Sequence, residues 1–554
     1  MTQVTIERAI QIAREHDRAG RLAQAEAVCR HVLAAWPNQP DALYLSALVC
    51  AKTNRDEQAV DLIRQAIAAA PDKPAYYCTL GGLLQKQGRL DEAIVCCQQA
   101  LALDGQLVDA HFNLGLLWKL TGRLEPSIAS YQRALALNPT FAPTLNNLGV
   151  TFTAAGRMDE AMACYHRALS LQPDYPDALN NLGRALRERG QLDEAIACYR
   201  KALAGRPEFA EALSNLGNAL RQQGRHVEAV ACYRRAVALR PELPDPHNNL
   251  AHGLLALGEL AQGWVEFEWR WRSAGFEPKR VFPKPEWTGS DQSADTVLLV
   301  HEQGYGDAIQ FIRYVPLVAA RCRRVLLECP ADLIALFEGM PGIAELMARD
   351  QPLPEFDEYC TLLSLPRIFQ TTLASIPSEV PYLKAEAGRA AAWSARLGAD
   401  PRFKIGLAWA GSPIHTNDRN RSIAPAVLSP LGEIPGVVVH SLQKGAASPT
   451  QSLPTGMKII DHTADLRDFA DTAALIANLD LVISVDTAVA HLAGALARPV
   501  WTLLPFAADW RWLLDRTDSP WYPTMRLFRQ PSIGDWDSVV KQVAGALRLH
   551  LNAL

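Results

Sequence analysis

Residues 176–209 read PDALNNLGRALRERGQLDEAIACYRKALAGRPEF, and residues 210–243 read AEALSNLGNALRQQGRHVEAVACYRRAVALRPEL. The two stretches are equally long and carry glycine, tyrosine, alanine and proline at matching places. These positions recur along the first half of the chain with a period of 34 residues, and the glycines of one such series are Gly20, Gly88, Gly122, Gly156, Gly190, Gly224 and Gly258. A constant period over this length predicts stacked repeats that share one continuous core.

Each unit reads as two helices joined by a turn. The turn glycine, such as Gly190, ends the first helix in the left-handed conformation, and Pro207 and its equivalents end the second. The glycine of Leu182-Gly183 lets the second helix approach closely. This unit resembles the tetratricopeptide repeat, and about eight copies fit between residues 6 and 277. We expect bulky residues of the last copy to seal the stack against the next domain: Trp264, Phe267, Trp269 and Trp271.

One recurring position suggests a binding function. An asparagine precedes the Leu-Gly position or its equivalent in five units: Asn113, Asn147, Asn181, Asn215 and Asn249. A carboxamide both donates and accepts, so it pairs with a peptide unit whatever the side chain. The series resembles the asparagine ladder of O-linked N-acetylglucosamine transferases, which join such repeats to a GT-B domain. The resemblance implies that these asparagines hold an acceptor polypeptide; the alternative is that they only bond neighbouring helices.

Beyond about residue 278 the period ends and strands alternate with helices. Runs of apolar residues predict strands at 296–300, 325–328, 404–410, 437–442, 481–485 and 499–504. This alternation predicts parallel sheets covered by helices, with ligands beyond the carboxyl ends of the strands. We therefore expect an α-solenoid over 6–277 followed by an α/β domain of two Rossmann-like lobes, 278–385 and 386–554, with a linking helix over 386–400.

Two short motifs follow predicted strands in this α/β part. The first is Gly306-Asp307, ahead of a helix predicted to start at Ala308; the second is DTAVAHLAGAL at 486–496. Both resemble marks of lipopolysaccharide heptosyltransferases and related GT-B enzymes, a resemblance that covers roughly residues 296–530 and implies a GT-B fold. That family usually carries a glycine near the position of Ala488, so the turn that meets the donor phosphates differs here.

The second motif is a candidate site for the diphosphate of a nucleotide sugar. Amides of Thr487 to Ala490 lie at a helix N-terminus, which favours phosphate, and arginine matches phosphate geometry. The predicted donor-binding residues are Arg419, Arg421, Lys444, Asp486, Thr487, Ala488 and His491. For Asp486 and Thr487 the alternative is helix capping, for His491 a purely structural histidine, and for the two arginines an exposed loop.

Asp307 is the candidate general base, a role that the resemblance implies for the Gly-Asp turn. The base takes a proton from an acceptor hydroxyl while the diphosphate leaves with inversion, and the cationic side chains replace a metal. Its alternative is a helix cap, with His301 and His415 as reserve bases. The aromatic run with Trp510, Trp512, Trp521 and Tyr522 is expected to pack the lobe interface, with sugar stacking as the alternative.

The composition excludes several classes of protein. Lys plus Arg number 55 and Asp plus Glu number 59, which gives a net charge of -4. The chain therefore lacks the excess of basic residues that is typical of nucleic-acid binders. We find no secretory signal and no run of ~20 apolar residues, so we expect a cytoplasmic protein with no membrane span. The eleven cysteines have no metal-ligand spacing, and Cys164, Cys198 and Cys232 recur with the 34-residue period of the repeat. This pattern predicts packing roles for them, no metal and no cofactor besides the donor substrate.

Together these features predict a metal-independent, inverting glycosyltransferase that moves a sugar from a nucleotide donor to Ser or Thr hydroxyls of a protein. Flagellin is a candidate acceptor by analogy with bacterial flagellin glycosyltransferases. Two alternatives stay open. The first is a non-catalytic scaffold with a degenerate transferase domain, and the second is a transferase acting on lipopolysaccharide sugars.

Overall fold

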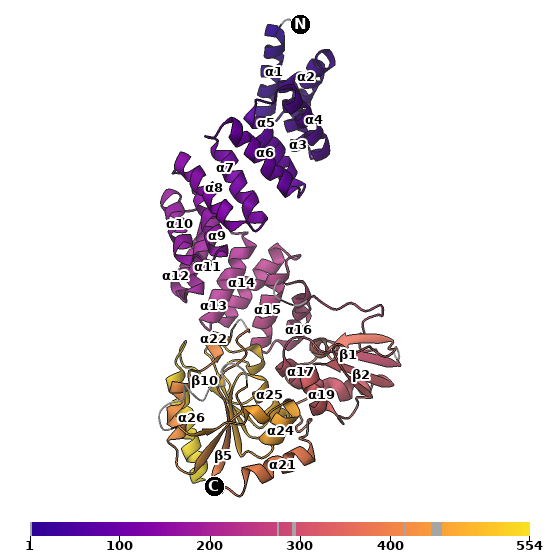
Figure 1. Ribbon diagram of the computed structural model, residues 1–554, viewed down its shortest axis with the longest axis vertical. Helices are drawn as coiled ribbons and strands as arrows, with labels where there is room; N and C mark the ends of the chain where they lie inside the picture. The colour runs from indigo at the N-terminus through magenta and orange to yellow at the C-terminus, as the bar shows by residue number, and fades with distance from the viewer. Residues whose placement is uncertain are drawn as a thin grey trace. The chain divides into compact units, whose positions relative to one another are not determined.

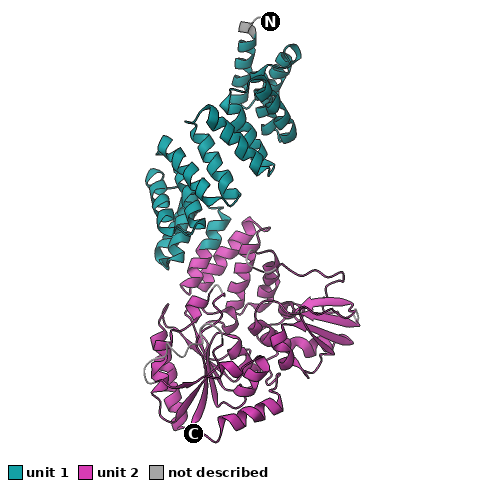
Figure 2. Cartoon of the chain, viewed as in Figure 1, with its two compact units in different colours: residues 1–215 teal, residues 216–554 magenta. Residues whose placement is uncertain are grey.

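The computed structural model describes residues 3–273, 276, 278–290, 295–414, 417–444 and 457–553. The chain divides into two compact units, residues 1–215 and 216–554 (Figure 2). The division falls inside the repeats, because the last repeat helices share a core with the α/β part: Leu255 and Trp264 pack in the same cluster as Val297 and Phe311.

The first unit is a run of antiparallel helix pairs (Figure 1). Its helices are α1 Gln3–Arg18, α2 Leu22–Ala35, α3 Pro40–Lys52, α4 Asp56–Ala69, α5 Pro74–Lys86, α6 Leu90–Leu103, α7 Val108–Leu120, α8 Leu124–Leu137, α9 Ala142–Ala154, α10 Met158–Leu171, α11 Pro176–Glu188 and α12 Leu192–Gly205. Helix α13, Ala210–Gln222, includes the residue at which the two units divide.

The turn glycines adopt the predicted conformation. Gly88, Gly156 and Gly190 have φ of 77°, 74° and 78°, and Asn54, which fills one glycine position, has φ of 58°. Each ends a first helix, since the left-handed region is strained for most side chains. The prediction of helix pairs separated by left-handed turns is confirmed.

The second glycine of the unit is a close-approach position. A β-carbon on Gly183 would lie 2.7 Å from the Tyr199 ring, and one on Gly149 would lie 2.5 Å from the Tyr165 ring. Both tyrosines are completely buried. The glycine and tyrosine series therefore form one packing unit, with the ring lying directly against the bare backbone of the facing helix.

The second unit holds the last repeats and two parallel sheets. The repeat helices are α14 His226–Leu239, α15 Pro244–Ala256 and α16 Leu260–Phe267, followed by the 3₁₀ helix η1, Glu268–Arg272. The strands are β1 Thr296–Val300, β2 Arg324–Cys329, β3 Glu345–Ala348, β4 Glu358–Thr361, β5 Phe403–Ala408, β6 Val437–Ser441, β7 Ile459–Ile460, β8 Leu481–Val485, β9 Val500–Leu504 and β10 Met525–Arg529. Their orders are β3-β2-β1-β4 and β10-β9-β8-β5-β6-β7.

Helices cover these sheets as expected for parallel strands (Figure 1). The helices of the α/β part are α17 Tyr305–Phe311, α18 Val315–Ala319, α19 Ala331–Phe337, α20 Leu365–Ile368, α21 Ala387–Leu397, α22 Asp418–Arg421, α23 Ser429–Gly432, α24 Phe469–Ile476, α25 Ala488–Ala495 and α26 Trp536–Asn552. The register pairs Leu298 with Leu326 in one sheet and Leu407 with Ile483 in the other, through buried strands. Two Rossmann-like α/β lobes are thus confirmed.

Every strand predicted from the sequence is present, within two residues at each end. The sequence analysis missed β3, β4, β7 and β10. Strands β3 and β4 form the two edges of their sheet, and both are only four residues long with a glutamate at the start. The predicted linking helix is α21.

Candidate functional site

The two motifs of the α/β part lie against each other. Helix α17 follows β1 and helix α25 follows β8, so both begin at carboxyl ends of parallel strands. A β-carbon on Gly306 would lie 3.0 Å from His491 Cδ2 and 3.6 Å from Ala488 Cα. Gly306 therefore permits close contact between the lobes, at the kind of edge where α/β folds bind ligands.

Helix α17 begins at Tyr305, three residues earlier than predicted, so Asp307 lies in its first turn and not in the preceding loop. Asp307 Oδ2 accepts a hydrogen bond from the backbone nitrogen of Gly304 at 2.9 Å. This is the helix cap that we considered as the alternative to a catalytic role. The other oxygen, Oδ1, pairs with Arg511 of the opposite lobe.

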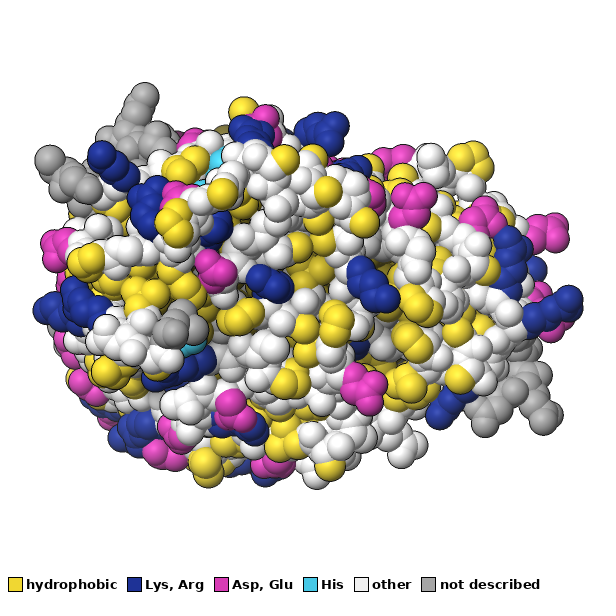
Figure 3. All heavy atoms as spheres, turned by 90° about the horizontal axis from the view of Figure 1, so that it is seen from below, with side chains coloured by type: hydrophobic (Ala, Val, Ile, Leu, Met, Phe, Trp, Pro, Cys, Tyr) yellow, Lys and Arg dark blue, Asp and Glu magenta, His cyan; other side chains and the backbone are white. Residues whose placement is uncertain are grey.

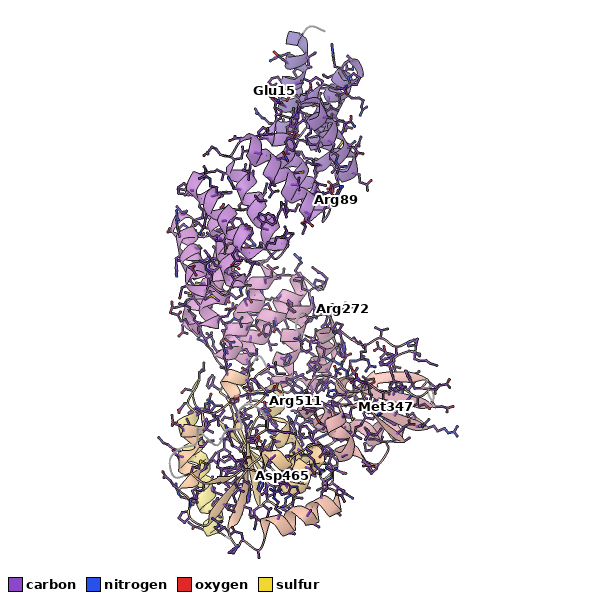
Figure 4. All side chains as sticks on the ribbon, in the orientation of Figure 1. Glu15, Arg89, Arg272, Met347, Asp465 and Arg511 are labelled. Atoms are coloured by element: carbon purple, nitrogen blue, oxygen red, sulfur yellow. The ribbon has the colours of Figure 1, made fainter. Side chains whose placement is uncertain are left out.

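Arg511 is a central charged group that the sequence analysis did not select. Its Nε donates to Gln310 Oε1 at 2.7 Å, and its guanidinium also pairs with Asp509, at 2.8 Å, and with Asp307. Arg511 lies in the 3₁₀ helix η7, Trp510–Trp512, and Figure 4 labels it between the two lobes. The two carboxylates outweigh the cost of burial and raise the pKa of Arg511 above its usual value.

Burial also alters the carboxylates around Arg511. Burial, together with the negative charge of Asp509, raises the pKa of Asp486 to about 6. Burial alone would raise the pKa of Asp509 as well, but the charge of Arg511 outweighs it and lowers that pKa. The charge of Arg511 thus favours the ionised form of Asp509, whereas Asp486 gains a proton in mildly acidic solution.

His491 is a neutral histidine facing Asp486. Its Nδ1 lies 2.9 Å from the Tyr522 hydroxyl, its Nε2 lies 4.0 Å from Asp486 Oδ1, and its ring stacks on Trp512 at 5.3 Å between centroids. Burial, reinforced by the charge of Arg511, lowers its pKa to about 3. If Tyr522 donates to Nδ1, the remaining proton sits on Nε2 and points toward Asp486.

The predicted cationic residues separate into two groups. Arg421 donates to the carbonyl of Asp486 at 3.0 Å and pairs with Asp418 at 3.2 Å, so it supports the Asp486 turn directly. Arg419 is exposed, and Lys444, also exposed, donates to the carbonyl of Arg467 at 3.2 Å.

Thr487 and Ala488 begin helix α25. Thr487 is the residue before the helix, has an extended backbone, and its hydroxyl lies 3.1 Å from Ser484 Oγ. Of the reserve bases, His301 has its Nε2 3.4 Å from the carbonyl of Gly304, beside the cap of α17. His415 lies outside the described residues.

The aromatic run packs the interior, as expected. Trp510, Trp512, Trp521 and Tyr522 are buried. Trp510 meets Trp264 of the last repeat edge-on at 5.2 Å, and Trp521 meets Phe311 of α17 at 5.8 Å. The prediction that Trp264 seals the end of the stack is thereby confirmed.

The asparagine series makes contacts between successive repeats. In the first unit, Asn181 Nδ2 donates to Asn146 Oδ1 at 2.9 Å, and Asn215 Nδ2 donates to Asn180 Oδ1 at 2.9 Å. These are the helix-to-helix bonds of the alternative interpretation. All five asparagines, Asn113, Asn147, Asn181, Asn215 and Asn249, are only partly buried. Since a carboxamide has two donor hydrogens and two acceptor sites, one such bond leaves capacity for a ligand.

Other expected features concern cysteine, metal and membrane. All eleven cysteines are free, and Cys97 lies 3.3 Å from where a β-carbon of Gly81 would be, a packing role. Across the described ranges, no group of three or more His, Cys, Asp or Glu side chains is arranged to hold a metal ion. Within those same ranges, no helix combines the length and apolar character that crossing a membrane requires.

Figure 3 shows one face with charges of both signs interspersed.

Comparison with protein families matches both halves of the chain. Tetratricopeptide repeat models match residues 18–80, 140–208 and 180–244, and further repeat models match 83–121 and 108–141. The model for glycosyltransferase family 9 (heptosyltransferase) matches residues 462–507. This second match contains Asp486, Thr487 and His491, and it supports a glycosyltransferase-like function.

Among curated proteins the chain is similar to Protein FlbA of Caulobacter vibrioides, with 31% identity over 324 residues. The match covers 53% of this chain and 53% of FlbA, so the chain spans about half the length of that relative.

Among solved structures, the chain is similar to MamA, with 25% identity, coverage of 29% of this chain and 95% of MamA, and a TM-score of 0.28. The PilW structure, described as a widely conserved type IV pilus biogenesis factor, has 24% identity, coverage of 40% and 100%, and a TM-score of 0.36. The family models alone show that the chain joins tetratricopeptide repeats to a region, residues 462–507, similar to glycosyltransferase family 9.

Proposed function

We propose that this protein transfers a sugar from a nucleotide-sugar donor to Ser or Thr hydroxyls of a polypeptide held by the repeats. One observation carries the proposal: Gly306-Asp307 and the Asp486–His491 segment, far apart in the sequence, lie in contact, and each follows the carboxyl end of a parallel strand, β1 or β8. Ligands of doubly wound α/β folds bind at such edges. The family 9 match over 462–507 gives the chemical class.

The donor occupies the second lobe in this proposal. Its diphosphate lies at the N-terminus of α25, against amides from Thr487 to Ala490, with Arg421 beside the same turn. In this proposal Asp486 accepts a hydrogen bond from a sugar or ribose hydroxyl, and His491 donates one to phosphate. Arg419 lies in α22, which follows β5, and Lys444 follows β6. Both side chains are exposed, so a bound anion can attract them, in the case of Lys444 in exchange for its bond to the Arg467 carbonyl.

Asp307 is the proposed base. Its carboxylate takes the proton of the acceptor hydroxyl, the hydroxyl oxygen forms the new bond to the anomeric carbon, and the bonding electrons leave with the nucleoside diphosphate. Arg511 holds the Asp307 carboxylate in place through their ion pair. The direction of displacement makes the reaction inverting, and arginine and amide groups take the part that a metal plays in other transferases.

The acceptor is held by the asparagine series. Asn147, Asn181 and Asn215 present partly buried carboxamides at equal intervals along the repeats. A regular series of carboxamides suits an extended backbone because the peptide unit is the same at every residue. Flagellin is the first acceptor that we would test.

The test incubates the protein with a panel of labelled nucleotide sugars and a cell lysate, and then measures label on protein by mass spectrometry. We expect one donor to give a mass increase equal to its own sugar residue on Ser or Thr of a discrete polypeptide. Label on lipopolysaccharide sugars instead would favour the carbohydrate-directed alternative. An absence of transfer, hydrolysis and binding across the panel would contradict the proposal.

One observation favours a non-catalytic scaffold as the second candidate. Both oxygens of Asp307 already have partners, Gly304 and Arg511, so the carboxylate already serves as a helix cap and as an ion-pair partner. On that hypothesis, repeats bind a client protein and the lobes bind no nucleotide. Calorimetric titration with nucleoside diphosphates separates the two candidates without requiring an acceptor.

A further inference from the structure

A buried arginine joins the end of the repeats to the first lobe. Arg270, in η1, is completely inaccessible to solvent. Its Nε and Nη2 donate to the two oxygens of Glu302 at 3.0 and 2.9 Å, and Nη1 donates to the carbonyl of Phe267 and to Glu268, both at 3.0 Å. Nη2 also donates to Ser364 Oγ at 2.9 Å. This paired geometry is specific to arginine.

Glu302 lies in the short segment that carries the candidate base. It stands between the end of β1 at Val300 and the start of α17 at Tyr305, five residues before Asp307. Besides Arg270, its Oε1 accepts from the backbone nitrogen of Leu363 at 3.1 Å. The position of the segment therefore depends on a residue outside the α/β fold.

The second lobe holds the same segment from the other side. Gly306 lies against His491, and Arg511 pairs with Asp307. The last repeats also meet both lobes at their turns: a β-carbon on Gly258 would lie 3.0 Å from Leu373, and one on Gly224 would lie 3.3 Å from Phe506. Segment 301–307 is thus fixed between the end of the repeats and the edge of the second lobe.

We propose that Arg270 is a positioning residue for sugar transfer: acting through Glu302, it places Asp307 against the donor lobe. The segment that ends the last repeat then helps to position the candidate base, in addition to closing the array that binds the acceptor. This inference rests on the proposed function. Because general-base catalysis depends on geometry, a displacement of about 1 Å costs on the order of 100-fold in rate.

The test replaces the buried pair without leaving an unpaired charge. In the double variant Arg270→Met, Glu302→Gln, both charges are gone and the new carboxamide still accepts from Leu363. Glu268, partly exposed, turns to water or to Arg367, 3.8 Å away. Replacing a buried ion pair by uncharged groups often preserves stability, whereas removing one partner does not. The matched control is Arg280→Met, Glu328→Gln, which removes an Arg–Glu pair with a buried carboxylate in the same lobe.

Two measurements on the full chain decide the matter. Hydrogen exchange reports the amides of residues 303–308, and nucleotide release from the active donor reports turnover. We expect exchange there to rise on the order of ten-fold or more in the double variant. We expect kcat to fall by about 100-fold with KM for the donor unchanged, because the donor is held by the other lobe. The control variant leaves both quantities within two-fold, as a rough limit.

Unchanged exchange in the folded double variant overturns the inference, as does faster exchange with wild-type kcat or an equal effect in the control. If the double variant does not fold, Arg270→Lys keeps the charge but loses the paired geometry, and the same two results are expected with smaller size. If the wild-type protein releases no nucleotide from any donor, the proposed function fails. Exchange at 303–308 in the double variant then decides alone whether Arg270 holds the segment.

Discussion

The contacts within the repeats and those at the lobe junction, where Asp307 meets Arg511 and Gly306 meets His491, differ in how far apart the contacting residues lie in the sequence. Gly183 and Tyr199 meet within one 34-residue unit, and the same contact recurs as Gly149 with Tyr165. Asp307 and Arg511 are 204 residues apart, and their pair occurs once. Local, repeated contacts leave a periodic trace in the sequence, while single long-range contacts leave none. Stability of the array and chemistry at the junction should therefore respond to different substitutions.

The largest effect is expected from Asp307→Asn. It removes the candidate base and the ion pair with Arg511, while the side-chain oxygen still caps α17. We expect transfer to fall by about 10²–10⁴-fold, the usual contribution of a general base. Nucleotide release and product formation measure it.

The control for that variant is Asp332→Asn. Asp332 accepts a hydrogen bond at 2.7 Å from the hydroxyl of Tyr305, which lies on α17 together with Asp307. Wild-type transfer by Asp307→Asn would remove Asp307 from the role of base. His301 would then be the next residue to replace.

Asp486 should show that function and stability conflict at the junction. Its pKa is raised to about 6 in the folded protein, because burial disfavours the charge. The unfolded chain loses this proton at lower pH, so the group costs stability increasingly as pH rises from about 4 to about 6, by on the order of 1 kcal/mol per pH unit. Asp486→Asn should thus be more stable than wild type at pH 7.5 yet fail to bind donor.

Thermal unfolding at pH 4 and pH 7.5 checks the linkage. The control is Asp480→Asn, because Asp480 immediately precedes β8 whereas Asp486 immediately follows it. Equal effects of Asp486→Asn at the two pH values would contradict the raised pKa. Retained donor binding would contradict the assigned role.

The glycine–tyrosine contact tests the other side of the comparison. Gly183→Ala places a β-carbon 2.7 Å from the Tyr199 ring and should destabilise the array by about 1–3 kcal/mol through overpacking. Gly82→Ala is the matched control, since nothing lies within 4 Å of its β-carbon; it should stabilise α5 by about 0.5–1 kcal/mol. Donor hydrolysis should be unaffected by either. Equal stability of the two variants in chemical denaturation would contradict the packing account.

The smallest effect is expected from Asn181→Ala. It removes both the bond to Asn146 and the proposed peptide contact, so acceptor affinity should fall by about five-fold, the equivalent of one hydrogen bond of ~1 kcal/mol. Asn146→Ala removes the same helix-to-helix bond from a buried position. If acceptor binding weakens equally in both variants, the asparagines serve only to join the helices.

The sequence predicted the fold well wherever one segment carries its own signal. Turn glycines, the two lobes and strands such as β1 and β8 follow from local periodicity or buried apolar runs. Edge strands β3 and β4 were not predicted, because four residues that begin with a charged side chain form too short an apolar run. At the site, Asp307 and Asp486 were selected, whereas Arg511 and Arg270 were not. The role of each arginine depends on a partner that only folding brings close: Arg511 pairs with Asp307, and Arg270 pairs with Glu302.

The most direct test of the account is a crystal structure of the full chain soaked with the nucleoside diphosphate of the active donor. We expect the diphosphate at the N-terminus of α25, bonded to amides near Thr487 and within reach of Arg421, with Asp307 on the opposite side of the contact between the lobes. A junction filled by side chains, or a nucleotide bound elsewhere on the second unit, would contradict it.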